Sequence, residues 1–147
     1  MSTVIPLRFK SHYDPELLSA GVKFNLIRLL ADVDFKTLDG WSPKFQAIID
    51  TGSPANIIPQ YIWSQSINRL ILAKKFSLGG IGEGKVFGYL GEVTARVSYR
   101  AKSTKPLKLR AFLLETDSAP LILGFEDFLT MSTLLSSYPK NLASVKF

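Results

Sequence analysis

The sequence contains no cysteine and only one histidine, His12. Without cysteine the chain can form no disulfide, no thiolate zinc site and no thiol nucleophile. A nucleophilic pair of serine and histidine would have to use His12, and a single histidine cannot build a histidine-rich metal site. We therefore expect a protein that needs no metal and no other cofactor.

Long apolar runs are also missing. The apolar stretch at residues 24–30 is interrupted by Arg28, and nothing approaches the roughly 20 apolar residues that a membrane-spanning helix needs. Residues 1–10 lack both the apolar segment and the small-residue cleavage site of a secretory signal. These absences predict a soluble, cytoplasmic protein without a membrane partner.

The apolar residues that are present are arranged mainly as strands. Of the 147 residues 46% are hydrophobic and 20% charged, which suffices for one buried core. Alternation at residues 29–35, followed by turn residues and a second strand at 45–49, predicts a hairpin. Residues 93–100 alternate in the same way, and 107–114 should pair back on them. With no repeat or linker, one all-β domain over residues 1–147 is expected.

Helical signals are few. Apolar spacing at residues 125–136 predicts one short amphipathic helix near the C-terminus. Residues 14–18 suit a single helical turn, and 142–147 suit a closing strand.

The net charge of +6 is concentrated in one segment without acids. Its cations are Arg96, Arg100, Lys102, Lys105, Lys108 and Arg110. A solvated strand pair explains them, and so does an anionic partner such as nucleic acid. Because no interleaved aromatic residues or nucleic-acid motif accompany the charge, we favour the solvated strands over a nucleic-acid partner.

An apolar strand at residues 47–49 leads directly into Asp50, Thr51, Gly52 and Ser53. A carboxylate at the end of a buried strand is costly unless hydrogen bonds or a second carboxylate sharing its proton compensate. The N–H of Gly52 could supply such a bond. Alone, Asp-Thr-Gly suits an ordinary turn equally well.

Glycines crowd the segment at residues 77–86. Gly79, Gly84 and Lys85 fit most of a phosphate-binding loop, but Val86 stands where that loop needs a hydroxyl, and strand rather than helix follows. A β-hairpin tip that approaches an extended ligand explains the glycines better.

A third segment, residues 121–124, is an apolar strand that ends at Gly124. In this order the three segments resemble the retropepsin-like family of single-lobed aspartic proteases, over residues 29–147. The likeness to the catalytic loop covers Asp50, Thr51, Gly52 and Ser53. The likeness to the flap tip covers Gly79, Gly80, Ile81 and Gly82. Leu123 and Gly124 are similar to the strand end that packs beneath the catalytic loop.

The resemblance implies an all-β, single-lobe acid-protease barrel with a flap hairpin and one short C-terminal helix. It implies an aspartic endopeptidase, whose chemistry needs two carboxylates around one water. Because one Asp-Thr-Gly occurs here, we expect a homodimer that contributes Asp50 twice. Thr51 would brace the two loops, and flaps centred on Ile81 would close over an extended polypeptide.

Two further expectations concern the site. A hydroxyl at Ser53 could donate to the carboxylate of Asp50 and favour its charged form. Apolar subsites are expected from Ile57, Ile58, Ile81 and Ile122.

The sequence also departs from the family. Retroviral members commonly have an acid after the catalytic turn, paired with an arginine after the later glycine, where this chain has Pro54-Ala55 and Phe125-Glu126. Residues 1–28 match poorly, and this N-terminal extension could be an extra strand, a propeptide or a flap-side insertion. Two alternatives stay open: a catalytically silent peptide-binding or dimerisation module on the same fold, and a basic β-barrel that binds nucleic acid.

Overall fold

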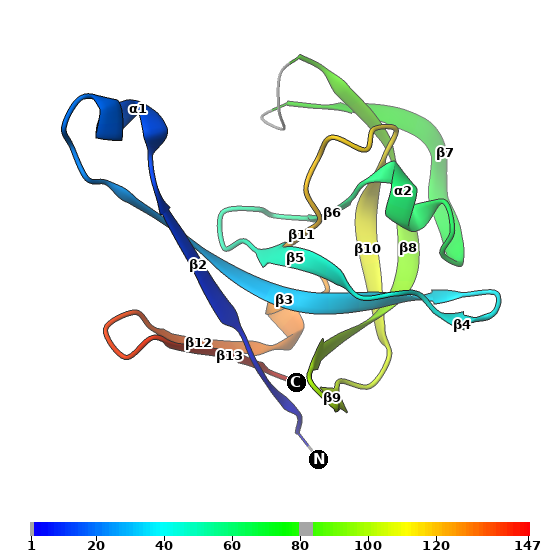
Figure 1. Ribbon diagram of the computed structural model, residues 1–147. Coiled ribbons are helices and arrows are strands. Elements are labelled where there is room, and N and C mark those ends of the chain that lie inside the picture. The colour runs from blue at the N-terminus through cyan, green and yellow to red at the C-terminus, as the bar shows by residue number, and fades with distance from the viewer. Residues whose placement is uncertain (1, 80–83) are drawn as a thin grey trace.

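The computed structural model describes residues 2–79 and 84–147. It is a mostly-β protein, with 56% of residues in strands and 8% in helices (Figure 1). No helix in the described ranges is both long and apolar enough to cross a membrane.

A large mixed sheet makes up most of the molecule. Its strands lie in the order β2 (Arg8–Tyr13), β3 (Asn25–Thr37), β5 (Phe45–Ile49), β11 (Ile122–Leu123), β6 (Asn56–Ile58), β10 (Leu107–Leu114), β8 (Val86–Tyr99) and β7 (Asn68–Leu78). The short strands β4 (Gly40–Trp41) and β9 (Lys102–Ser103) pair with β3 and β8. Strand β3 also pairs directly with β8, so the sheet turns back on itself.

A second, three-stranded antiparallel sheet joins the two ends of the chain. It consists of β1 (Val4–Pro6), β13 (Leu142–Lys146) and β12 (Thr133–Ser137) in that order. The N-terminal residues thus supply two strands, β1 here and β2 in the large sheet, and the expected closing strand at the C-terminus is confirmed as β13.

Both strand pairs expected from alternation are confirmed. Strands β3 and β5 pair antiparallel from Leu29↔Ile49 to Val33↔Phe45, and β10 pairs antiparallel with β8 along its whole length. The alternating apolar residues of β3 and β8 form the centre of the core, because each strand turns one face inward. Asp34 lies on the opposite face of β3 from these apolar residues, yet it is only 3% exposed, because Arg96 pairs with it and stacks over the Trp41 ring.

The helices are α1 (Pro15–Ser19), α2 (Gln60–Trp63) and the 3-10 turn η1 (Leu129–Met131). The single turn expected near residue 14 is confirmed as α1, with Asp14 as its N-cap. The predicted helix at residues 125–136 is wrong. Asp127 has a left-handed φ of 62°, which interrupts a helix, and the residues after η1 pair with β13 as β12. Backbone pairing across the sheet outweighs the helical spacing of apolar residues.

Candidate active site

Asp50 follows the last residue of β5, which lies between β3 and β11 in the large sheet. The N–H of Asp50 donates to the carbonyl of Leu123 over 3.0 Å, so the start of the loop is fixed to β11. Its carboxylate Oδ1 accepts the N–H of Gly52 over 2.8 Å, and its own carbonyl accepts the N–H of Ser53 over 3.2 Å. The loop therefore folds back and holds one carboxylate oxygen while Asp50 stays partly exposed.

Asn56 fixes the far end of this loop, and sequence reasoning missed it. Its side chain is fully buried; Nδ2 donates to the carbonyls of Arg110 and Glu126 at 2.9 and 2.8 Å, and Oδ1 accepts the N–H of Gly124 at 2.9 Å. One amide thus joins the end of the Asp50 loop to β10 and to the segment after β11. The available signal was a single polar residue at the start of an apolar strand, because such a residue must be hydrogen-bonded when buried.

Gly124 lies directly beneath the loop, and Leu123 is fully buried next to it. A Cβ built on Gly124 would lie 2.4 Å from the carbonyl oxygen of Ser53 and 2.5 Å from that of Ala55. The N–H of Phe125 donates to the same Ser53 carbonyl over 3.0 Å. The backbones of β11 and the loop are therefore in direct contact, and glycine is the residue that fits there.

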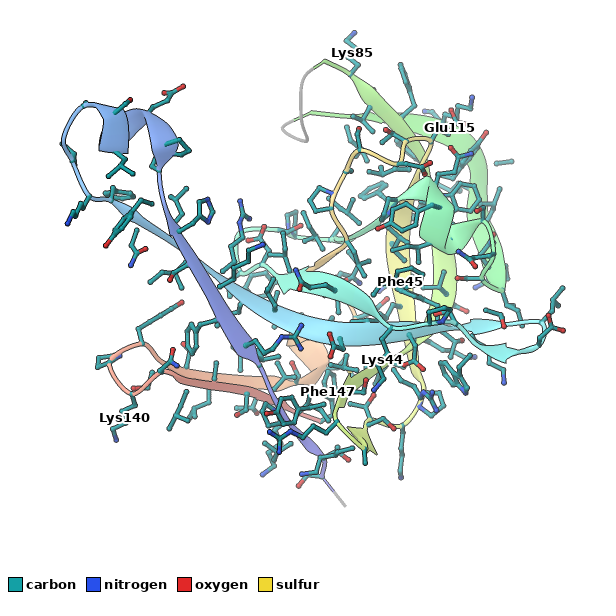
Figure 2. All side chains as sticks on the ribbon, in the orientation of Figure 1. Lys44, Phe45, Lys85, Glu115, Lys140 and Phe147 are labelled. Carbon is teal, nitrogen blue, oxygen red and sulfur yellow. The ribbon has the colours of Figure 1, made fainter. Side chains whose placement is uncertain are left out.

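A largely apolar hollow of about 290 Å³ opens beside Asp50. Its walls come from the loop, β6, β10, β11 and the end of β7, and include Asp50, Gly52, Ile57, Leu78, Gly79, Phe112 and Ile122. Strands β7 and β8 form a hairpin that pairs as far as Leu78↔Val86, near Lys85 (Figure 2). Gly80, Ile81 and Gly82 lie outside the described residues.

Two details of the expected site are corrected. The Ser53 hydroxyl donates to the carbonyl of Ala55 over 2.7 Å and not to Asp50, because the backbone turn brings that carbonyl within reach. Ile58 is fully buried in the main core, facing away from the hollow that its neighbour Ile57 lines. Adjacent strand residues face opposite sides of a sheet, so both could not line the same subsite.

Asp50 also borders a second hollow, of about 300 Å³, on the other side of the loop. Thr51 is exposed there, and the remaining walls come from the early part of β3, from β5 and from β12. Asp50 is the only acidic residue lining either hollow within the described part of the chain. It therefore lies between an apolar hollow and an open side of the molecule.

Charged side chains gather around Arg110, whose carbonyl accepts a hydrogen bond from Asn56. Arg110 contacts Asp127 through Nε at 2.8 Å and Glu126 through Nη2 at 2.8 Å. The chain lacks the ion pair that retroviral members commonly have near the catalytic turn, but this different ion pair lies in the same region, at Glu126 and Asp127. The hydrogen bond from Arg110 holds the pKa of Asp127 below its ordinary value. Since Arg96 pairs with Asp34, two of the six cations in the basic segment have acidic partners from elsewhere in the chain. This pairing reduces the free charge available to a nucleic acid.

Within residues 2–79 and 84–147, no cluster of three or more histidine or acidic side chains could hold a metal ion. Comparison of the chain with protein-family models, curated proteins and solved structures found no match.

Proposed function

We propose that the protein is an aspartic endopeptidase of the retroviral type, in which two copies bring their Asp50 carboxylates together around one water. The observation that carries this proposal is the setting of Asp50. One carboxylate oxygen is fixed by Gly52, an apolar hollow opens on one side, and an open face with Thr51 lies on the other.

The arrangement of strands supports the same proposal. Because β3 pairs with both β5 and β8, six strands form a ring, as an acid-protease barrel would require. Strand β11 lies between β5 and β6, parallel to the first and antiparallel to the second, beneath the Asp50 loop. The end of β7 in the β7–β8 hairpin, at Leu78, lines the apolar hollow, where a flap would lie.

The proposed chemistry needs one protonated and one ionised carboxyl. The ionised Asp50 takes a proton from the water as its oxygen attacks the peptide carbonyl, and the protonated Asp50 of the partner gives its proton to the carbonyl oxygen. The tetrahedral diol then breaks its C–N bond: the newly protonated Asp50 gives its proton to the leaving amine, and a diol hydroxyl gives a proton to the partner's ionised Asp50 as the new carboxylic acid forms. Cleavage should therefore decline at both low and high pH around an acidic optimum.

The substrate is proposed to be an extended polypeptide with apolar side chains beside the cleaved bond. Ile57, Phe112 and Ile122 line the hollow next to Asp50, and apolar side chains buried against them would gain the most free energy. Backbone groups near the end of β7 could pair with an extended peptide as a further strand.

The test is cleavage of a peptide library at several pH values between 3 and 7, with products identified by mass spectrometry. Wild type should cleave, with inhibition by a statine-type inhibitor and with a specific activity that falls on dilution. Asp50→Asn should be inactive, whereas Asp39→Asn, in the exposed β3–β4 turn, should keep full activity.

Two results would overturn the proposal. Cleavage by Asp50→Asn at the wild-type rate would exclude Asp50 as the catalytic group. Absence of cleavage by a wild-type sample shown to be dimeric would favour the catalytically silent module.

A further inference from the structure

Residues 8–28, which we call the arm, leave the body of the molecule as a two-stranded hairpin. The arm comprises β2, α1 and the first part of β3, and projects to the upper left in Figure 1. No residue of the arm is buried. Its exposed apolar side chains, with exposed fractions between 38% and 54%, are Tyr13, Leu17, Leu18, Val22, Phe24 and Ile27.

The arm has a defined internal structure. Its strands pair up to Tyr13↔Asn25, and beyond that pair the N–H of Asp14 donates to the carbonyl of Phe24 over 2.9 Å. At its base, Arg8 pairs with Asp32 over 2.9 Å and the Phe9 ring packs on Tyr138 with centroids 5.3 Å apart. Contacts at its base thus fix the direction of the arm, while the side chains around α1 lie away from the body (Figure 2).

Such an arrangement indicates that something covers the tip of the arm, residues 14–24. A two-stranded hairpin is only marginally stable in water, and gathered exposed apolar side chains mark interaction sites. No side chain of α1 is fully buried by the chain itself.

The position of the arm identifies what covers it. Ile27 and Arg28, where the arm meets the body, line the same hollow as Asp50 and Thr51. The opposite wall of that hollow comes from β12, whose hairpin with β13 turns at Lys140 on the same side of the molecule (Figures 1 and 2). The arm and this hairpin therefore flank the open side of the Asp50 loop.

We infer that the arm reaches across the dimer and packs its apolar tip on the second copy of the chain. This inference rests on the proposed function, which puts the twofold axis beside Asp50. An arm that starts beside that axis and projects from the body is in reach of the partner, and symmetry makes the exchange mutual. Residues 14–24 carry Asp14 and Glu16 against Lys23, a net charge of −1, so a second copy of this overall basic chain does not repel them. Residues 8–28 would then be an interface element of the active enzyme and not a removable propeptide.

The test compares dimer dissociation constants by sedimentation velocity. The arm variant carries Leu17→Ser, Leu18→Ser and Phe24→Ser. The control carries Leu38→Ser and Met131→Ser, two exposed apolar residues outside the arm that are even more exposed than the arm residues. We expect the arm variant to raise the dissociation constant by at least about tenfold, because several apolar side chains lose their burial. The control should leave it unchanged, and far-UV circular dichroism should match wild type in both.

A second variant removes the tip altogether. Because Tyr13 pairs with Asn25, residues 14–24 can be replaced by Asn-Gly as a two-residue hairpin turn. This variant should fold but remain monomeric, and it should therefore lose the cleavage activity that depends on dimer formation.

The outcomes separate the two ideas. A wild-type dissociation constant in both arm variants, or loss of the β signal in both, overturns the role of the arm and leaves the peptidase proposal standing. A wild-type dimer that depends on the arm but cleaves nothing supports the arm and overturns the peptidase. A wild-type protein that is monomeric at every concentration overturns the arm, and if it cleaves it also overturns the paired Asp50.

Discussion

Gly124→Ala tests whether the backbone of β11 really packs on the Asp50 loop. The added Cβ would lie 2.4 Å from the Ser53 carbonyl oxygen, whereas an ordinary contact begins at 3.4 Å, so the loop must retreat by about 1 Å. A movement of that size would stretch the 3.0 Å bond from the Phe125 N–H to Ser53 beyond hydrogen-bonding range. The second close contact, at 2.5 Å from the Ala55 carbonyl, blocks an easy escape in that direction.

The expected cost is about 3 kcal/mol in the free energy of unfolding, from about 2 kcal/mol of overpacking, in the middle of its usual range, and about 1 kcal/mol for one lost hydrogen bond. For a chain of this length that lowers the melting temperature by roughly 10 °C. Urea denaturation followed by circular dichroism measures the first quantity, and a thermal scan measures the second. Peptide cleavage, measured where the variant is fully folded, should fall by about 100-fold, because Asp50 would be misplaced.

The control for this experiment is Gly79→Ala. A Cβ built on Gly79 meets no atom within 4 Å, so its unfolding free energy should stay within about 0.5 kcal/mol of wild type. If Gly124→Ala were as stable as Gly79→Ala and cleaved peptides at the wild-type rate, the close packing of β11 on the loop would be refuted.

Three other changes probe the surroundings of the site. Asn56→Ala should cost roughly 2–4 kcal/mol in urea denaturation, because it leaves three backbone groups without their partner, whereas exposed Asn25→Ala should cost little. Asp127→Asn should flatten the acid limb of the stability profile: the lowered folded-state pKa stabilises the protein above the ordinary value of 3.8, and this stabilisation is lost as the pH falls through the folded-state pKa. Equal slopes for wild type and variant in acid denaturation would contradict this. Ser53→Ala should leave the pH optimum of cleavage unchanged, because the hydroxyl donates to the Ala55 carbonyl and not to Asp50. An upward shift of the optimum would contradict this and indicate a direct hydrogen bond from Ser53 to Asp50.

Sequence reasoning succeeded where local pattern and tertiary pairing agree. Alternation in β3 and β8 identified the buried faces, since a strand facing a core on one side must alternate. It failed at residues 125–136, where the spacing of Phe128 and Leu129 suits a helix but the positive φ of Asp127 and pairing with β13 produce a turn and a strand. Asn56 and Arg110 were missed for a related reason. Their partners lie 16 to 70 positions away, so no window along the chain contains them.

The sequence by itself determined the chemical inventory: no thiol, one histidine, an apolar strand running into Asp50-Thr51-Gly52, and enough alternating apolar residues for one β core. These are properties of composition and short-range order, which need no knowledge of distant contacts. The tertiary structure alone decided what surrounds that inventory. It brought β11 under the Asp50 loop, aimed the Ser53 hydroxyl at Ala55, and extended residues 8–28 as an uncovered arm beside the open side of Asp50. Each of these depends on which strands become neighbours, and that choice is made by the burial of the whole core and not by any segment alone.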